Sequence, residues 1–309
     1  RLYSAKSLYF CNLKRIISVK IVKVVNALEQ FAPLSLQADF DNAGMQIGLT
    51  EAEVSGALLC LDVTEAVVDE AISKGLNLII SHHPLIFHKL RRITGEDSVQ
   101  RTVMKALKNG IAILSMHTNL DSVRGGVNYK IAEKLGLEQL SFIGKQQQVS
   151  VDTTEAEEHE KLCCELQPRQ TTGYTFKPAV IEGADGVIGT LKQPLAADDF
   201  VLKLRKTFDV ECVMCNQLLR RPIRTVALCG GAGDFLLDDA ICEKADAFIT
   251  GEMHYHQYFG HDQEIQICVI GHYQSEQFTT EIFRDILSHR CPQLTTYITE
   301  INTNPIIYL

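Results

Sequence analysis

The sequence predicts an α/β protein made of two facing lobes with mostly parallel sheets. Apolar runs typical of buried strands alternate with amphipathic stretches typical of helices, and this alternation occurs twice along the chain. The length of 309 residues also exceeds that of a usual single domain. A polar, weakly periodic stretch separates the halves. We therefore expect a disordered leader at residues 1–18, an N-terminal lobe at 19–140, a connecting segment at 141–178 and a C-terminal lobe at 179–309.

Each half of the chain is expected to alternate strands with helices. The first half should form helices over residues 19–32, 64–73 and 97–108 and strands over 57–63, 76–81 and 111–115. The second half should form strands over 225–229, 247–250 and 265–270 and helices over 235–244 and 275–288. Such an order implies right-handed crossovers with helices on both faces of a sheet. The charge run Glu155–Lys161 in the connecting segment is expected to be a solvated helix face.

Composition and charge narrow the class of protein. The net charge of -8 and the pI near 5.7 disfavour a nucleic-acid partner, which needs a clustered basic surface. No apolar run approaches the roughly 20 residues of a membrane span, so we expect no membrane partner. Residues 1–25 carry only basic charges, a pattern that can mark a transit peptide, although a disordered leader is the simpler interpretation.

The ten cysteines indicate a reducing compartment. Many lie inside apolar runs, as Cys60, Cys229 and Cys268 do, which is typical of buried free thiols. A cytoplasmic location is therefore expected. The pair Cys212 and Cys215 forms a lone CxxC without a second pair to complete a zinc site, so we interpret it as structural.

Eight of the ten histidines fall in two windows, residues 82–117 and 254–272, and both windows contain strand-to-helix junctions. His82 and His83 end a probable buried strand, where open α/β sheets build their sites. Asp121 follows the next strand and should reach the same sheet edge. Taken alone, a histidine pair can be one surface and one packed residue, and a strand-end aspartate is often a helix N-cap.

A second group of candidate ligands lies in the C-terminal half. His272 and Glu276 are four residues apart at the start of a helix, so both side chains project from one face. A surface hydrogen-bonded pair is the simple alternative. Together the two halves offer three imidazoles and two carboxylates, more than one open zinc site needs. A carboxylate can bridge two ions, and such mixed ligands suit Zn, Mn, Fe, Co or Ni alike.

These motifs resemble the NIF-three-like family, the GTP cyclohydrolase I type 2 homologues, over residues 19–309. The resemblance is carried by Asp41-Asn42-Ala43-Gly44 with Gly48, Ser81-His82-His83-Pro84, His117-Thr118-Asn119-Leu120-Asp121, Thr250-Gly251-Glu252 with His256, and His272 with Glu276. It implies two α/β lobes facing each other across a dinuclear metal site, and a ring-shaped homohexamer. The metal ligands that it implies are His82, His83, Asp121, His272 and Glu276. The short middle of the chain places it with the compact members.

The expected function is that of a metal-dependent hydrolase, with metal-activated water as the nucleophile. His117, Glu252 and His256 are candidates for proton transfer or for orienting ligands. The family's cyclohydrolase label suggests a nucleotide or phosphoester substrate, and the loop Cys229–Asp234 can be a phosphate cradle or a plain tight turn. The alternative is a metal-binding regulatory or interaction scaffold without turnover.

Overall fold

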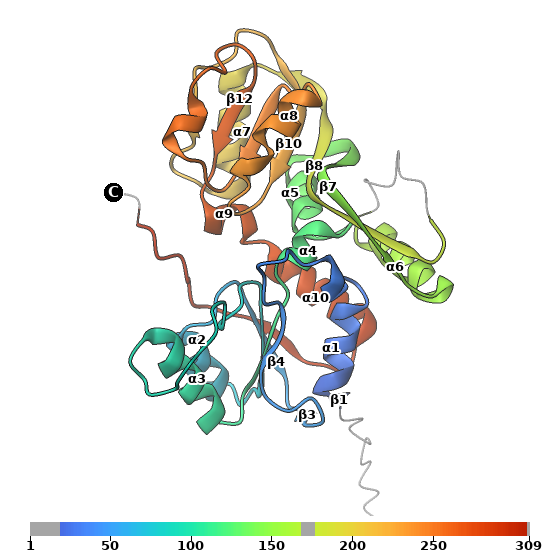
Figure 1. Ribbon diagram of the computed structural model, residues 1–309, viewed down its shortest axis with the longest axis vertical. Helices are drawn as coiled ribbons and strands as arrows, with labels where there is room; N and C mark the ends of the chain where they lie inside the picture. The colour runs from blue at the N-terminus through green and yellow to red at the C-terminus, as the bar shows by residue number, and fades with distance from the viewer. Residues whose placement is uncertain (1–18, 168–176, 308–309) are drawn as a thin grey trace, which may run out of the picture.

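The computed structural model describes residues 19–167 and 177–307, and the expected leader at residues 1–18 lies outside that range. Two α/β lobes are stacked along the long axis of the molecule, with short helices at their junction (Figure 1). The α/β class predicted from the sequence, with one sheet in each lobe, is confirmed. No helix of the described residues is long and apolar enough to cross a membrane.

The N-terminal lobe is built on a five-stranded sheet with the order β13-β4-β5-β6-β2. The strands are β2 (Gly44–Ile47), β4 (Ala57–Cys60), β5 (Leu78–Ser81), β6 (Ala112–Ser115) and β13 (Thr296–Ile298). All neighbours run parallel except β2, which pairs with β6 in the antiparallel sense. A small ribbon, β1 (Val19–Lys20) with β3 (Glu53–Val54), lies at its edge, so the first helix begins two residues later than expected.

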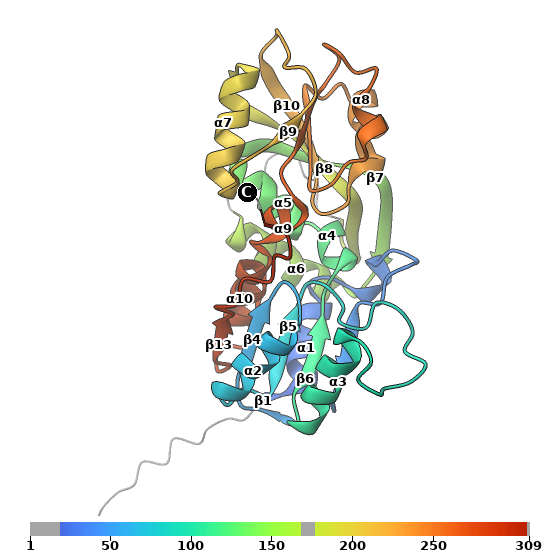
Figure 2. The same ribbon diagram turned by 90° about the vertical axis from the view of Figure 1, so that its left-hand side faces the viewer.

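Helices cover both faces of this sheet because its central strands are apolar on both sides. The helices are α1 (Ile21–Glu29), α2 (Glu65–Ser73), α3 (Ser98–Lys108) and α10 (Thr279–Arg290), with the 3-10 turn η1 (Leu34–Leu36) after α1. Leu59 and Ile80 pack with α1 and α10, whereas Leu58 and Ile79 pack with α2 and α3. Figure 1 shows the sheet between α2 and α3 on one side and α1 and α10 on the other, and Figure 2 looks onto the face that α2 and α3 cover.

The C-terminal lobe contains a six-stranded sheet with the order β7-β8-β10-β11-β12-β9. Its strands are β7 (Leu137–Ser150), β8 (Val180–Leu195), β9 (Met214–Cys215), β10 (Ile223–Cys229), β11 (Ala247–Thr250) and β12 (Gln266–Val269). Only β10, β11 and β12 are parallel, so this sheet is mixed. It is covered by α7 (Ala197–Phe208) and by η3 (Asp234–Leu236) with α8 (Leu237–Cys242), while η4 (Tyr255–Tyr258) follows β11.

The expected connecting segment at residues 141–178 is largely regular structure. Strands β7 and β8 form a long antiparallel pair that extends from Leu137↔Leu191 to Ser150↔Val180, with α6 (Thr153–Leu166) between them. The sequence did not indicate strand β7, because its glutamines lie at partly or fully exposed positions of a projecting ribbon and interrupt the apolar alternation of a strand. Helix α6 buries Ala156, His159, Leu162 and Cys163 and exposes most of its charges, so the solvated helix face was predicted correctly.

The end of the chain returns to the N-terminal lobe, which differs from the expected lobe at residues 179–309. After α9 (His272–Glu276), helix α10 packs Phe283 and Ile286 against the core that contains α1, and β13 then pairs with β4. This position buries the apolar face of α10, including Ile282, Phe283, Ile286 and Leu287. The chain therefore crosses between the lobes again after the C-terminal sheet is complete.

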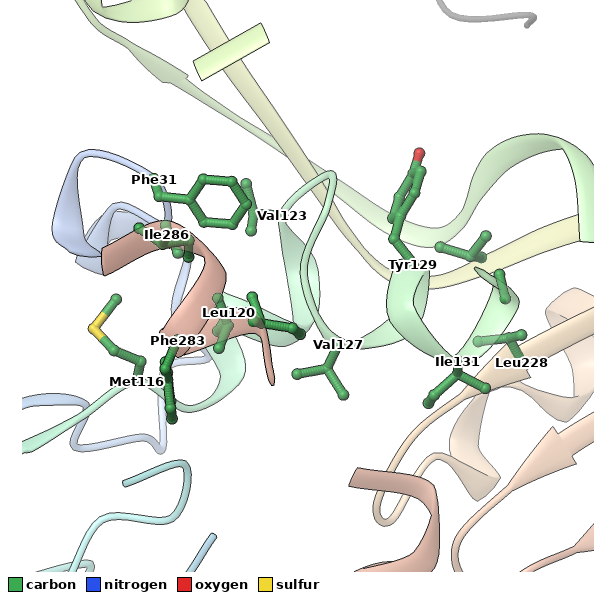
Figure 3. Close-up of a cluster of buried hydrophobic side chains, with 14 of the residues drawn as sticks. Phe31, Met116, Leu120, Val123, Val127, Tyr129, Ile131, Leu228, Phe283 and Ile286 are labelled. Carbon is green, nitrogen blue, oxygen red and sulfur yellow. The ribbon is translucent and has the colours of Figure 1, made fainter. Parts of the chain in front are cut away.

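Two short helices, α4 (Thr118–Ser122) and α5 (Val127–Leu135), join the lobes. Their buried side chains continue the core of one lobe into that of the other without interruption (Figure 3). Phe31 and Met116 lie at one end of this cluster, Val127 in the middle, and Ile131 with Leu228 at the other end. Since close-packed interiors resist deformation, the lobes are held in one relative position.

The cysteines of the described residues are all free, in agreement with the expected reduced thiols. Cys60, Cys229 and Cys268 are buried, as their apolar surroundings predicted. The CxxC pair ends on the edge strand β9, where Cys215 lies opposite Cys268 with their Sγ atoms 3.9 Å apart.

Candidate metal centre

The predicted ligands come from the carboxyl ends of strands in both lobes. His82 and His83 follow β5, and Asp121 lies in α4 after β6. Since β5 and β6 are parallel neighbours with Ser81 opposite Ser115, these side chains share one edge of the sheet. The C-terminal lobe contributes His272 and Glu276 from α9, which follows β12.

The Glu276 carboxylate lies at the centre of this group and is only 3% exposed. Its Oε1 is 3.6 Å from His82 Nε2, and its Oε2 is 3.0 Å from His83 Nε2 and 3.3 Å from His272 Nε2. Asp121 Oδ1 is 3.6 Å from His82 Nε2. The structure thus brings all five predicted ligands together, although they are separated by up to 194 positions in the sequence.

Each imidazole near the cluster is held through its Nδ1 atom. The acceptors are the Met116 carbonyl for His82 at 2.9 Å, Asp62 for His83 at 2.7 Å, Asp41 for His117 at 2.8 Å and Glu252 for His272 at 2.7 Å. A donated Nδ1–H leaves the Nε2 lone pair of a neutral ring available. This arrangement is typical of metal-binding histidines, whose other ring nitrogen donates to a carboxylate or carbonyl.

Three buried atoms in the centre have no hydrogen-bond partner of acceptable geometry within the described part of the chain. They are His82 Nε2, Asp121 Oδ1 and Glu276 Oε2. Burying such polar atoms without a partner costs about 1 to 3 kcal/mol each, so a group that satisfies several at once is favoured. Combinations of three side chains that could hold a cation are His82 with His83 and His117, His83 with His272 and Glu276, and His82 with Asp121 and Glu276.

The electrostatics of the metal-free cluster are dominated by Glu276. Burial acts to raise the pKa of Glu276, but the surrounding imidazoles outweigh it and hold that pKa well below its usual range. Burial also lowers the pKa of His83 and His272, yet their carboxylate partners raise the two values to about 10 and about 9. Burial and the nearby Glu276 charge raise the pKa of Asp121 well above normal. A cation must therefore displace protons from this cluster.

The cluster opens on a cavity of about 470 Å³ between the lobes. His117, Asp121, His272 and Glu276 form part of its wall, and the other lining residues include Phe40, Lys145, Asp185, Gly230 and Phe235. Sites that bind small molecules are commonly concave and partly apolar, as this cavity is.

The glycine loop Cys229–Asp234 supports the cluster and, of the two alternatives left open by the sequence, agrees with a tight turn and not with a phosphate cradle. The amides of Gly230, Gly231 and Gly233 already donate to Asn128, Ser275 and Thr250, respectively. Gly231 has φ +60, and a Cβ there would lie 2.3 Å from Glu276 Oε1. Close approach to the carboxylate therefore requires glycine at this position.

The structure separates the three candidates for proton transfer. His117 faces the cluster, since its ring centroid is 5.2 Å from that of His82. Glu252 orients His272. His256 lies in η4, where it is exposed and its ring contacts those of Tyr255 and Phe259, so the structure does not bring it to the cluster.

Sequence reasoning missed two carboxylates that hold imidazoles. Asp41 accepts from His117 and Thr118, and these bonds outweigh the effect of burial and lower its pKa. Asp62 follows β4 as His82 follows the adjacent β5, so its position at the end of a strand could have indicated it.

The fold and the cluster define a class: two-lobed α/β proteins with a set of potential metal ligands at the lobe junction. The chain belongs to the Duf34/NIF3 (NGG1p interacting factor 3) family, whose model matches residues 19–305. A GTP cyclohydrolase 1 type 2 homolog of Clostridium acetobutylicum is 31% identical over 84% of this chain and 86% of the relative. A homolog of the same name from Bacillus subtilis is 26% identical over 94% of this chain and 99% of the relative.

The solved structures agree with this family. A Staphylococcus aureus protein matches 94% of this chain and 99% of its own with a TM-score of 0.78 and 27% identity. A Bacillus cereus protein related to NIF3 shows the same fold, with a TM-score of 0.76 over 94% of this chain and 99% of its own, at 24% identity. The Bacillus subtilis alignment spans 373 positions, more than the 309 residues of this chain, so that relative carries additional residues, as expected of the longer members.

Proposed function

We propose that this chain binds two divalent metal ions at the cluster and hydrolyses a nucleotide or phosphoester there. The observation that carries the proposal is the convergence of His82 Nε2, Asp121 Oδ1 and Glu276 Oε2, which are buried and lack hydrogen-bond partners. These atoms come from both lobes, and folding brings them together at a desolvation cost that bound cations would offset.

The donor set would suit two ions, with Glu276 able to contribute to the binding of both. One combination contains His82, Asp121 and Glu276, and another contains His83, His272 and Glu276, so Glu276 is their only common member. Its two oxygens face different imidazoles, with Oε1 near His82 and Oε2 near His83 and His272. Mixed nitrogen and oxygen donors suit Zn, Mn, Fe, Co or Ni.

The residues around the cluster supply orientation and proton transfer. Two bound ions would lower the pKa of a water to about 7 and stabilise negative charge that develops on the substrate. Asp62 and Glu252 hold the rings of His83 and His272 in place. His117 lines the cavity with its Nδ1 held by Asp41, which places it to accept or donate a proton at Nε2.

The cavity supports an anionic substrate with a planar group. Lys145 contributes a cationic side chain to its lining, and bound ions would offset the negative charge of the lining carboxylates Asp39, Asp121, Asp185 and Glu276. Phe40 and Phe235, which are 71% and 59% exposed, offer aromatic faces at the same cavity. A nucleotide or an aryl phosphoester carries both features, and the relatives' name, GTP cyclohydrolase 1 type 2 homolog, points toward a nucleotide. We expect Lys145→Met to raise KM for such substrates about 10-fold and to change kcat little.

The alternative function is that of a metal-binding interaction scaffold without turnover. It is supported by the same exposed Phe40 and Phe235, since aromatic side chains are enriched at protein interfaces. The family description as an interacting factor agrees with it. The two functions differ in whether metal-loaded protein converts any substrate.

The experiment compares wild type, Glu276→Gln and His82→Ala with the control His289→Ala, which replaces an exposed histidine outside the cluster. Each protein is stripped with a chelator, reloaded with Zn²⁺, Mn²⁺ or Fe²⁺ and measured by elemental analysis. The loaded proteins are then screened against nucleotides and phosphoesters. We expect two ions in wild type and the control, and loss of metal and turnover in the two cluster variants. Undiminished metal in Glu276→Gln contradicts the ligand assignment, and metal-rich protein that is inert throughout favours the scaffold.

We further propose self-association as a homohexamer and a cytoplasmic location. The family resemblance supports the assembly, and the free cysteines of the described residues support a reducing compartment. Light scattering of the purified protein measures the assembly directly, and a mass of one or two chains contradicts it.

A further inference from the structure

The C-terminal segment 299–307 passes close to the metal cluster. It leaves the sheet after β13, where Thr299 N donates to the Leu59 carbonyl at 2.9 Å. It then runs beside α9 toward the C-terminal lobe (Figures 1 and 2). Residues 299–302 line a groove of about 330 Å³ together with Tyr273 and Gln274 of α9. The segment therefore lies against the helix that carries two of the proposed ligands.

One side chain of this segment connects to the cluster through a carboxylate. Thr303 Oγ1 donates to Asp62 Oδ2 at 2.6 Å, and Asp62 Oδ1 accepts from His83 Nδ1 at 2.7 Å. His83 Nε2 in turn lies 3.0 Å from Glu276 Oε2. Both oxygens of Asp62 are thus engaged, one by the proposed ligand and one by the C-terminal segment.

We propose that Thr303 is a positioning residue for the metal cluster: it fixes the Asp62 carboxylate, which in turn fixes the His83 imidazole. This inference rests on the proposed metal binding and assigns a role to a residue that touches neither the ions nor the substrate. Second-layer partners of ligating histidines typically change metal affinity 10- to 100-fold when they are replaced. Thr303 acts one layer further out, so its effect should be smaller.

The comparison with His82 explains why His83 needs this support. His82 donates to the Met116 backbone carbonyl, which is fixed by the chain, and the ring is fully buried. His83 depends on a side chain, and the Asp62 side chain is 33% exposed. A carboxylate rotates readily about its last bond. Without the Thr303 hydroxyl, water would solvate Oδ2, and the Asp62 carboxylate would no longer hold one orientation.

The experiment uses Thr303→Val, which keeps the shape but removes the hydroxyl, and Thr303→Ser, which keeps the hydroxyl. Thr295→Val is the matched control, because Thr295 is an exposed threonine that lies just before β13 and outside this segment. The first readout is Zn²⁺ affinity of the full-length, chelator-stripped proteins, measured by competition with a chromophoric chelator. The second is the NMR signal and exchange rate of the His83 Nδ1 proton in metal-free protein. Thermal unfolding establishes that every variant is folded.

We expect Thr303→Val to bind Zn²⁺ about 3- to 10-fold more weakly and to exchange the His83 proton faster, because one hydrogen bond in the chain is lost. Thr303→Ser and Thr295→Val should match wild type in both readouts. Equal affinity and equal exchange in wild type and Thr303→Val overturn the proposal, as does a loss in Thr303→Val that Thr303→Ser fails to restore. If wild type binds no Zn²⁺, the proposed function fails, and the proton-exchange readout still decides the role of Thr303.

Discussion

Replacing Glu276 by glutamine should destabilise the metal-free protein in a pH-dependent way. The substitution keeps the shape and removes the negative charge that lies among three imidazoles. The pKa of His83 rises from 6.5 to about 10 because the hydrogen bond to Asp62 and the Glu276 carboxylate, 3.0 Å from His83 Nε2, outweigh burial. At about 1.36 kcal/mol per unit, such a rise contributes roughly 4 to 5 kcal/mol to folding, and the two carboxylates share it. Losing Glu276 should therefore cost about 2 kcal/mol near pH 6.

The sign of the pH dependence follows from the raised pKa. Stability from a raised histidine pKa is fully present below about pH 6.5 and is lost as pH rises toward 10. The difference between wild type and Glu276→Gln should therefore shrink between pH 6 and pH 10. Urea unfolding in excess chelator at pH 6, 7.5 and 9 measures this difference. A cost that stays the same at all three pH values, or no cost at pH 6, refutes the reasoning.

Three further predictions concern the cluster and the core. Gly231→Ala should lose most of its metal, because the added Cβ would lie 2.3 Å from Glu276 Oε1. The control is Gly75→Ala, because Gly75 has a similar positive φ but open space around it. Equal metal content in the two variants contradicts the steric argument. Zn²⁺ affinity should rise from pH 6 to pH 9, because Glu276 and Glu252 raise the pKa of His272 to about 9 and the metal must displace the proton that this ring carries below that pH. Calorimetry in buffers of different ionisation enthalpy counts the released protons. Between pH 7 and pH 4.5, the free energy of unfolding should fall by about 2 to 3 kcal/mol less in His159→Leu than in wild type. Burial and two arginines lower the pKa of His159 to about 3, so below pH 6.5 the unfolded wild-type chain binds a proton that the folded one does not. Acid-unfolding curves that run parallel for the two proteins contradict this prediction.

Local patterns were sufficient to predict the strands that carry the proposed ligands. The apolar run ending at Ser81 indicated β5, and the carboxyl-end rule for parallel sheets then placed His82 beside Asp121. The spacing of His272 and Glu276 indicated a shared helix face, and α9 begins and ends at those two residues. These predictions succeeded because each depends on a few consecutive residues and on one general rule of sheet geometry.

Long-range pairing could not be predicted in this way. Nothing in the residues of β13 indicates that Ile298 lies beside Leu59 of β4, since any short apolar strand can pair with any free sheet edge. The same limit applies to the hydrogen bond between Asp62 and Thr303, which lie 241 positions apart. The polar strand β7 was taken for a linker because its exposed glutamines gave it no apolar alternation.

The position of β13 has a consequence for how the protein is made. The edge of the N-terminal sheet beside β4 is filled by residues 296–298, which a ribosome adds only after all six strands of the C-terminal sheet. During synthesis, this sheet edge and the face that α10 covers therefore stay exposed until the second lobe has been made. Exposed strand edges recruit other strands, so this interval is when the nascent chain is most exposed to aggregation and most in need of a chaperone.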